Sequence, residues 1–409
     1  MAFIYNLGIF LYGLFIRFAA LFNPKAKQFV VGRKALFLHL KDTVVSSQLP
    51  VVWFHCASLG EFEQARTLIE AYKAKHPDCR IILTFFSPSG FEVRKNYPHA
   101  DYIFYLPIDT PRNARRFINI VKPQKVFFIK YEFWYNYLNI LSKRRIAIYL
   151  VSANFRENQL FFKKRGAWYR SMLQKFKHIY VQNERSIKLL ESIEILNASI
   201  AGDTRFDRVA QIASQTKQIP IVERFAGNNM VFIAGSTWPT DELLIVQYIN
   251  QSQHQLKYII ASHEIHETQI NTIIQGITSK KCIRFSQANE NTIHEFDVLI
   301  IDNIGMLSSL YKYGKISYIG GGFGKGIHNT LEAATFGLPV IFGPCYTKFQ
   351  EALDLVEQGG AYPISNFKEL KHTIDSLIEN PQTLVKASNA ARQLVESNVG
   401  ATGKIIATC

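Results

Sequence analysis

A glycine-rich stretch, residues 320–340, carries the most specific chemical pattern in the sequence: GGGFGKGIHNTLEAATFGLPV. It follows an apolar run, and we expect a helix to begin near His328 or Asn329. Glycine lets backbone N–H groups approach an anion closely, and a helix start adds partial positive charge, so the stretch predicts a phosphate seat. Glu332, one turn into that helix, is placed to accept hydrogen bonds from ribose hydroxyls. The alternative is an ordinary glycine-rich turn with a surface glutamate.

The stretch matches neither of the two common phosphate-binding loops. Gly321 and Gly326 have the spacing of a Walker loop, but Ile327 stands where that loop needs lysine. The G-x-G-x-x-G pattern of dinucleotide-binding domains is absent as well, and the stretch lies far from the first strand of its half. A P-loop nucleotidase and a simple dehydrogenase are therefore both disfavoured.

Three further loops of the second half follow apolar runs, and we expect them to border the same nucleotide. Ser236 and Thr237 precede a helix that starts with proline, a pattern that suits phosphate but also an ordinary helix cap. His263 and His266 invite comparison with a metal site, but their spacing is not H-E-x-x-H and no third ligand is apparent. Contact with the nucleotide is the favoured interpretation for His263, and likewise for Asn303 and Gly305 in the third loop.

The first half contains a candidate general base. Glu61 follows the first apolar run through the sequence His-Cys-Ala-Ser-Leu-Gly-Glu, which places its carboxylate at the start of a helix. There it could remove a proton from a hydroxyl group, although a glutamate in a first turn also simply stabilises the helix dipole. Loops after later strands are expected on the same rim. We call the molecule that bears the reacting hydroxyl the acceptor. The residues predicted to contact it are Ser58, Gly60, Ser87, Ser89, Gly90, Glu132 and Arg156.

Short apolar runs alternate with amphipathic segments in both halves of the chain, which is the pattern of βαβ units on a parallel sheet. The fold class predicted is therefore α/β, with two Rossmann-like, doubly wound domains that face a cleft. The boundaries predicted are residues 1–22 for an anchor, 23–205 for an N-terminal domain, 206–229 for a linker and 230–409 for a C-terminal, nucleotide-binding domain. The last helix of the C-terminal domain is able to pack back on the N-terminal domain.

The excess of positive charge lies entirely in the first half of the chain. Of 409 residues, 47 are Lys or Arg and 32 are Asp or Glu. Residues 1–205 hold 31 basic and 14 acidic residues, a net of +17, whereas residues 206–409 hold 16 and 18, a net of −2. The first half is thus expected to face an anionic lipid, membrane or nucleic acid. The five scattered cysteines fit reduced thiols better than a disulfide framework.

The amino terminus predicts a membrane anchor. Residues 3–16 carry no charge, and the apolar character resumes after Arg17 as far as Phe22. Basic residues follow the apolar stretch rather than precede it, which argues against a secretory signal and for a chain that stays cytoplasmic. The segment either spans the bilayer or lies in its interface, and a core helix docked on the first domain is the alternative.

Several motifs together resemble a known family. They are HCASLGE, YLPIDTPRNARRFI, EFW, SANFR, GDTRFD, GSTW, DNIGML and HNTLEAATFGLPVIFGP, in this order along the chain. The chain resembles the 3-deoxy-D-manno-octulosonic acid (Kdo) transferases of lipopolysaccharide assembly nearly from end to end. The His-Asn-x-x-Glu element alone is shared by many two-domain glycosyltransferases, and the Gly-Glu element with GDTRFD narrows the resemblance to this family.

The resemblance implies a GT-B-type, metal-independent, inverting glycosyltransferase without a cofactor, at the cytoplasmic face of the inner membrane. The implied donor is CMP-Kdo and the implied acceptor is a phosphorylated tetraacyl lipid A precursor. Glu61 matches the family's base. The donor residues, from the resemblance and the loops together, are Arg205, Ser236, Thr237, His263, Asn303, Gly305, Gly324, Gly326, His328, Asn329 and Glu332.

This sequence departs from the family pattern at three places. Residues 261–265 are Ala-Ser-His-Glu-Ile where Pro-Arg-His-Pro-Glu is frequent, so an expected arginine is absent. Lys348-Phe349 replaces Asn-Phe, and Arg205 replaces a frequent lysine. Two other functions stay open: a transferase that uses a UDP-sugar on a lipid acceptor, and a non-enzymatic basic protein that binds membrane or nucleic acid. Recognised nucleic-acid motifs are absent, so no nucleic-acid partner is expected.

Overall fold

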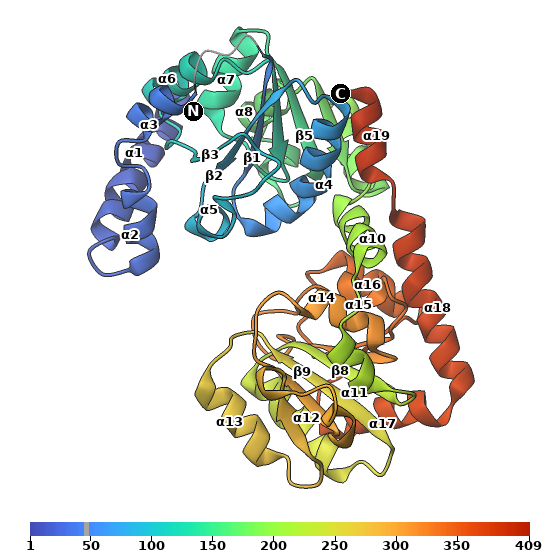
Figure 1. Cartoon of the computed structure of the whole chain (residues 1–409). Coiled ribbons are helices and arrows are strands. Elements are labelled where there is room, and N and C mark those ends of the chain that lie inside the picture. Colours follow the sequence, from blue (N-terminus) through green and yellow to red (C-terminus); the bar gives the residue numbers. More distant parts are fainter. Residues whose placement is uncertain (45–48) are drawn as a thin grey trace. The chain divides into compact units, whose positions relative to one another are not determined.

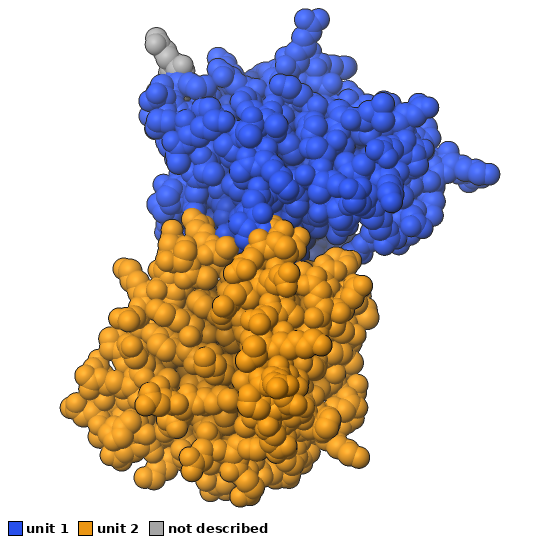
Figure 2. All heavy atoms as spheres, turned by 90° about the vertical axis from the view of Figure 1, so that its right-hand side faces the viewer, with its two compact units in different colours: residues 1–208, 399–409 blue, residues 209–398 orange. Residues whose placement is uncertain are grey.

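A computed structural model describes residues 1–44 and 49–409. The chain divides into two compact units, coloured separately in Figure 2. Unit 1 comprises residues 1–208 and 399–409, and unit 2 comprises residues 209–398. The chain therefore passes from one unit to the other twice, first within helix α10 (Thr204–Gln215) and again after α18 (Pro381–Asn398).

Unit 1 is built on a parallel sheet of seven strands in the order β3-β2-β1-β4-β5-β6-β7. Helices cover both faces of this sheet, so its strands are apolar on both sides and form nearly continuous hydrophobic runs. In β1, for example, Trp53 and Phe54 are both completely buried. The strands are β1 (Val51–Cys56), β2 (Arg80–Phe85), β3 (Tyr102–Tyr105), β4 (Lys125–Ile129), β5 (Ala147–Ala153), β6 (His178–Val181) and β7 (Ala198–Ile200).

The helices of unit 1 include one from the far end of the chain. Helix α19 (Ala401–Thr408) packs beside α4, where Lys75 Nζ donates to the carbonyl oxygen of Ile406 at 2.7 Å (Figure 1). The others are α1 (Ala2–Ala19), α2 (Pro24–Val31), α3 (Leu36–Thr43), α4 (Leu59–Lys75), α5 (Pro88–Arg94), α6 (Pro111–Val121), α7 (Tyr135–Lys143), η1 (Leu160–Phe162), α8 (Ala167–Leu173) and α9 (Glu184–Glu191).

Unit 2 repeats the design with a second parallel sheet of seven strands, ordered β10-β11-β9-β8-β12-β13-β14. Its strands are β8 (Met230–Thr237), β9 (Leu256–Ser262), β10 (Cys282–Arg284), β11 (Val298–Ile301), β12 (Ile316–Ile319), β13 (Val340–Phe342) and β14 (Ala361–Pro363). Its other elements are α11 (Pro220–Ala226), α12 (Pro239–Gln251), α13 (Glu267–Gly276), η2 (Phe285–Gln287), η3 (Ile293–Glu295), α14 (Leu307–Leu310), η4 (Tyr311–Tyr313), α15 (Leu331–Ala334), α16 (Gln350–Glu357) and α17 (Phe367–Glu379).

Each sheet has a point at which the strand order reverses. It lies between β1 and β4 in unit 1 and between β8 and β12 in unit 2. In open α/β sheets, ligands bind beyond the carboxyl ends of the strands at such a point. The predicted α/β class with two doubly wound domains is confirmed, and the loops after β1, β4, β8 and β12 are among those singled out in the sequence.

The first helix of unit 1 presents an unusually apolar surface. Helix α1 is long and apolar enough to cross a membrane, and it is the one such helix in the described residues. It lies beside α2 at the edge of unit 1 (Figure 1). The large apolar side chains that it exposes are Phe3, Ile4, Leu7, Phe10, Leu11, Tyr12, Leu14, Phe15 and Phe18, and Leu21 and Phe22 follow directly.

Candidate functional site

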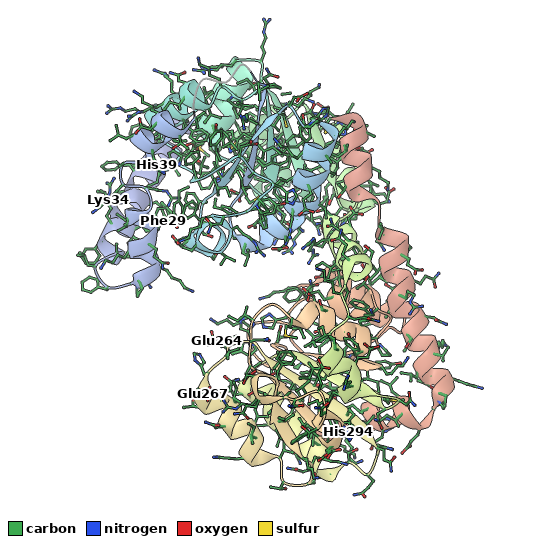
Figure 3. All side chains as sticks on the ribbon, in the orientation of Figure 1. Phe29, Lys34, His39, Glu264, Glu267 and His294 are labelled. Atoms are coloured by element: carbon green, nitrogen blue, oxygen red, sulfur yellow. The ribbon has the colours of Figure 1, made fainter. Side chains whose placement is uncertain are left out.

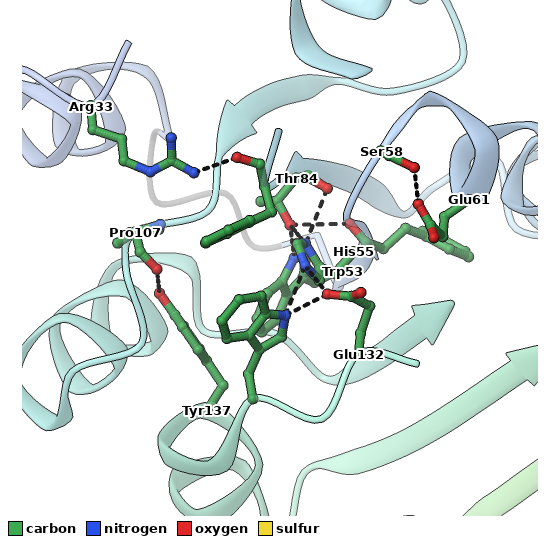
Figure 4. A network of polar contacts seen from close by, with 12 residues as sticks. Arg33, Trp53, His55, Ser58, Glu61, Thr84, Pro107, Glu132 and Tyr137 are labelled. Atoms are coloured by element: carbon green, nitrogen blue, oxygen red, sulfur yellow. Dashed lines mark hydrogen bonds and ion pairs between the residues drawn. The ribbon is translucent and has the colours of Figure 1, made fainter. Parts of the chain in front are cut away.

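Glu61 lies in the first turn of α4, directly after β1. Ser58 adopts an extended conformation (φ −140°) as the residue before the helix, so α4 begins at Leu59. The Ser58 hydroxyl donates a hydrogen bond to Oε2 of Glu61 (Figure 4). Glu61 is half-buried and Gly60 beside it is exposed, so solvent reaches this turn. The carboxylate is thus oriented by a neighbouring hydroxyl and remains accessible, as a general base must be.

The carboxyl ends of β1 and β4 are joined by a buried polar network, drawn in Figure 4. Nε2 of His55 lies 3.1 Å from Oε2 of Glu132, and Nδ1 of His55 lies 2.8 Å from Oγ1 of Thr84. Trp134 Nε1 also donates to Oε2 of Glu132, at 2.5 Å. The His55 side chain is completely buried and Glu132 is 8% exposed. The network fixes the loop after β4 to β1, the strand that directly precedes the turn with Glu61.

Sequence reasoning named Glu132 but missed His55 and Thr84. The pattern that could have revealed His55 is its position, because it is the one polar residue in the otherwise apolar strand Val51–Cys56. A polar group in such a strand must find a partner when it is buried. The neighbouring Cys56 is not a candidate nucleophile. Burial, together with Glu61, raises the pKa of its thiol well above the ordinary value, so the reactive thiolate is disfavoured.

The loop after β2 lies against the loop after β1. The backbone N–H of Ser87 donates to the carbonyl oxygen of Ala57 at 2.8 Å, and the hydroxyls of Ser87 and Ser89 are 2.8 Å apart. Gly90 is buried, and a Cβ atom there would come within 2.3 Å of the Phe85 ring. Ser87 and Ser89 therefore join the Ser58 turn on one rim, whereas Gly90 packs beneath it. Its predicted contact with the acceptor stays a prediction.

Arg156, the last of the predicted acceptor residues, follows β5 on the exposed surface of unit 1. Its backbone N–H donates to Oε1 of Gln159 at 2.9 Å, which fixes the turn. The structure thus places Arg156 at the carboxyl end of the same sheet.

In unit 2, four of the predicted donor residues line one cavity of about 500 Å³ at the carboxyl ends of β8, β9 and β11. They are Ser236, His263, Asn303 and Gly305. Glu264, labelled in Figure 3, lines it as well. Loops far apart in the sequence are thus brought together as expected, and the volume is of the size that binds small molecules.

Three rings connect this cavity to the glycine-rich loop. The centroids of Trp238 and His263 are 4.7 Å apart, and those of His263 and His328 are 4.2 Å apart, both in stacked geometry. Trp238 Nε1 donates to Nε2 of His328 at 3.0 Å, so that nitrogen carries a lone pair rather than a proton. Burial and the nearby His263 lower the pKa of His328, which favours the same neutral form. Trp238 was not among the predicted site residues.

The glycine-rich loop comes very close to the loop after β8. A Cβ atom on Gly320 would lie 2.2 Å from the carbonyl oxygen of Ser236, so only glycine fits there. Gly321 has φ +93°, and its carbonyl oxygen accepts from the N–H groups of Gly324 and Gly326. The backbone N–H groups of Lys325, Ile327 and Asn329 find no acceptor among the described residues. The loop therefore offers unpaired donors, as an anion seat requires.

The helix that follows starts later than the sequence indicated. Helix α15 begins at Leu331, not near His328 or Asn329, and has four residues. The N–H of His328 donates to the carbonyl oxygen of Gly320 at 3.1 Å, which ties this residue to the end of β12. Asn329 caps the helix, with Oδ1 accepting from the N–H of Leu331 and Nδ2 donating to Oε1 of Glu332. A single turn has a weak dipole, so loop N–H groups become the main anion donors.

Thr330 was also missed by the sequence reasoning. Its side chain is completely buried, and its hydroxyl oxygen has no hydrogen-bond partner in the described part of the chain.

Two predicted donor residues have other partners. Thr237 is completely buried, and its hydroxyl donates to Oε1 of Glu242 at 2.9 Å. Arg205 belongs to unit 1, where its Nε and a terminal nitrogen bind Oδ2 of Asp203 at 2.9 and 2.7 Å. Their contacts with a donor remain predictions, and the hydroxyl proton of Thr237 is already bound by Glu242.

Comparison with known proteins shows which family the chain resembles. Residues 31–208 match the family described as 3-deoxy-D-manno-octulosonic-acid transferase (kdotransferase). A 3-deoxy-D-manno-octulosonic acid transferase of Rickettsia prowazekii is 29% identical over 358 residues, 85% of this chain and 77% of the relative. One of Aquifex aeolicus is 27% identical over 352 residues, 84% of this chain and 90% of the relative. Over most of its length the chain is similar to the Kdo transferases, and residues 31–208 match the model of that family. The resemblance inferred from its motifs is confirmed.

Kdo transferases are glycosyltransferases of lipopolysaccharide synthesis, and solved structures agree with the fold. A UDP-N-acetylglucosamine 2-epimerase of Neisseria meningitidis, bound to UDP-GlcNAc, has a TM-score of 0.60 at 17% identity, over 87% of this chain and 98% of its own. MurG of Acinetobacter baumannii has a TM-score of 0.56 at 12% identity, over 88% and 98%. At this identity they establish the GT-B-like architecture alone.

Proposed function

We propose that this protein is a Kdo transferase, which moves Kdo from CMP-Kdo to the glucosamine 6-hydroxyl of a tetraacyl lipid A precursor with inversion at the anomeric carbon. Similarity to the Kdo transferases supports Kdo as the transferred sugar. The observation that carries the proposal is the convergence of predicted donor residues on one cavity of unit 2, next to a loop with unpaired N–H groups. An oriented and accessible carboxylate in unit 1 supplies the base.

The proposed reaction is a single displacement. Glu61 accepts the proton of the attacking hydroxyl while that oxygen forms a bond to the anomeric carbon of Kdo. The bond from that carbon to the phosphate oxygen breaks, and the electron pair leaves with CMP. Backbone N–H groups of residues 324–329 stabilise the charge that develops on the departing phosphate. Attack on the face opposite the leaving group inverts the configuration. No metal or cofactor is part of this proposal.

The acceptor side of the proposal is supported by charge. The net of +17 over residues 1–205 suits a substrate that carries phosphate groups on a lipid, whereas the nearly neutral second half suits a mononucleotide bound by loop N–H groups. Contacts of this kind are screened by salt, so acceptor binding should weaken as ionic strength rises.

We further propose that α1 lies in the membrane interface on the cytoplasmic face of the inner membrane rather than spanning it. One side of α1 is held by unit 1. The hydroxyl of Tyr5 donates to Oδ2 of Asp109 at 2.6 Å, and Asn136 Nδ2 donates to Oδ1 of Asn6 at 2.8 Å. Gly13 is buried, and a Cβ atom there would contact the Ile108 side chain at 3.7 Å. A helix crossing the bilayer would have to leave these contacts, whereas a flat helix keeps them and inserts its apolar side.

A nucleotide-binding experiment tests the donor class. Titration calorimetry with CMP and with UDP, on the full chain in detergent, should give measurable binding of CMP and at least tenfold weaker binding of UDP. Equal or tighter binding of UDP would favour the transferase that uses a UDP-sugar, the alternative left open by the sequence. Binding of neither nucleotide would contradict the assignment of unit 2 as a donor domain.

A further inference from the structure

Two adjacent acidic residues, Asp241 and Glu242, are buried in the first turn of α12. They are 1% and 5% exposed. Among the described residues, every hydrogen bond that they accept comes from a neutral group. Burying a carboxylate is costly unless its hydrogen bonds repay the cost. Moreover, negative charge close to a seat for an anionic donor opposes binding. The burial of this pair beside the donor site therefore needs an explanation other than the negative charge of its carboxylates.

Asp241 holds the glycine-rich loop to the loop after β8. Its Oδ2 accepts from the backbone N–H of Gly321 and from that of Trp238, both at 2.9 Å. Its Oδ1 accepts from the hydroxyl of Tyr318 in β12 at 2.6 Å. Gly321 belongs to the proposed phosphate seat, and Trp238 begins the ring stack. One carboxylate thus sets the separation of the two loops on either side of the strand reversal.

Glu242 holds the loop after β8 to the loop after β9. Its Oε1 accepts from the hydroxyls of Thr237 at 2.9 Å and Ser262 at 2.7 Å. Gln269 in α13 donates to both carboxylate oxygens, at 2.8 and 2.9 Å. Ser262 lines the cavity and precedes His263. Glu242 therefore fixes the two loops that carry Ser236 and His263.

A carboxylate is the side chain suited to this arrangement. It accepts hydrogen bonds at about four positions and donates none, so it can bind several donor groups from different elements at once. The first turn of a helix stabilises its negative charge, and Asp241 occupies the third helical position, the position of a capping box. One of these bonds, from the N–H of Trp238 to Oδ2 of Asp241, also caps the start of α12.

We propose that Asp241 and Glu242 are positioning residues of the donor site. Through their hydrogen bonds, rather than their charge, they fix the loops after β8, β9 and β12 in the arrangement that binds the nucleotide. The proposal rests on the assignment of unit 2 as the donor domain. It adds two residues that do not contact the substrate themselves but fix the positions of the residues that do.

Substitutions that separate hydrogen bonding from charge test the proposal. In Asp241→Asn, the amide oxygen can accept from both N–H groups while the amide nitrogen donates to the Tyr318 oxygen, so the loops keep their geometry. Asp241→Leu has the same shape and accepts nothing. We expect the leucine variant to raise the Kd for CMP and the KM for CMP-Kdo at least tenfold, and the asparagine variant to leave both within threefold. Glu242→Gln and Glu242→Leu should form a second pair with the same contrast.

A matched control separates positioning from stability. Asp375 in α17 accepts from the hydroxyl of Tyr248 at 2.9 Å and is paired with Lys371, but it contacts none of the donor loops. Asp375→Ala should lower the melting temperature and leave the Kd for CMP within twofold. If Asp241→Leu does not fold, Gln269→Ala replaces it, because this change removes donors to Glu242 from a half-buried helix surface. It should raise the Kd at least threefold.

Three results would overturn the proposal. The first is a Kd for CMP within threefold of wild type in folded Asp241→Leu, or within twofold in Gln269→Ala. The second is an Asp241→Asn variant that binds CMP as weakly as Asp241→Leu, and the third is an equal loss of CMP affinity in Asp375→Ala. Amide hydrogen exchange without nucleotide distinguishes its failure from that of the proposed function. The N–H groups of Gly321 and Trp238 should be protected in wild type and exposed in Asp241→Leu. If protection changes in this way but wild type binds no CMP, the proposed donor is wrong; if protection does not change, the positioning role is wrong.

Discussion

The hydroxyl of Ser58 donates to the carboxylate of Glu61, which lies three residues further along the chain in the first turn of α4. This bond selects one orientation of a side chain that would otherwise rotate freely at a solvent-accessible turn. Removing it should impair the transfer step without affecting the nucleotide. In Ser58→Ala we expect kcat to fall about tenfold, equivalent to about 1.4 kcal/mol, with the Kd for CMP unchanged. Steady-state kinetics together with calorimetry would measure both. A loss of CMP affinity equal to the loss of kcat would argue against a role confined to Glu61.

Gly320 permits the closest backbone approach between two donor loops. Gly320→Ala places a Cβ atom 2.2 Å from the carbonyl oxygen of Ser236, so the loops must separate. We expect a loss of about 1–3 kcal/mol in the free energy of unfolding and a clear loss of CMP affinity. Gly403→Ala is the control, since nothing lies within 4 Å of its Cβ position in α19 and alanine favours a helix. Equal CMP affinity in Gly320→Ala and wild type would contradict the described loop geometry.

Asp109 should make the stability of unit 1 depend on pH. Burial raises the pKa of its carboxyl to about 6 in the folded protein, against 3.8 ordinarily. The folded state therefore retains a proton that the unfolded chain releases, and the stabilisation is complete below about pH 4 and lost as the pH rises through 6. The difference corresponds to about 3 kcal/mol. In chemical denaturation, wild type should lose this amount relative to Asp109→Asn between pH 4 and 7. A constant difference would show that the carboxyl is not perturbed.

The apolar side of α1 should determine binding to membranes. Phe10 and Phe15 are 57% and 69% exposed, so changing both to aspartate should leave the fold intact while opposing insertion. We expect flotation with anionic vesicles to drop at least tenfold. Tyr5→Phe removes only the bond to Asp109 and should retain vesicle binding. Unchanged flotation of the double variant would rule out α1 as the anchor.

Much of the fold followed from the sequence because each signal was local. Strand runs such as Val51–Cys56 are apolar throughout, which is what a parallel sheet covered on both sides requires. Ser236, His263, Asn303 and Gly305 could be assigned to one site because residues that follow parallel strands meet at one edge of the sheet.

What the sequence did not reveal depends on contacts between distant residues. The late start of α15 goes with a bond from the N–H of His328 to the carbonyl oxygen of Gly320, eight residues earlier in the chain. Likewise, the stacking of Trp238 on His263 and the bonds of Asp241 to Gly321 and Tyr318 join separate elements. Glu132 was expected to contact the acceptor, but its bonds to His55 and Trp134 were not foreseen.

Mass spectrometry of the lipid product tests the central claim most directly. The purified full chain is incubated with CMP-Kdo and a tetraacyl lipid A precursor, in parallel with a Glu61→Gln variant that retains CMP binding. The account predicts that wild type adds one or more Kdo increments to the lipid and that the variant adds none. If wild type binds CMP but adds no Kdo increment to the lipid, the proposed reaction is contradicted. If Glu61→Gln adds Kdo at a near-normal level, the assignment of Glu61 as the base is contradicted.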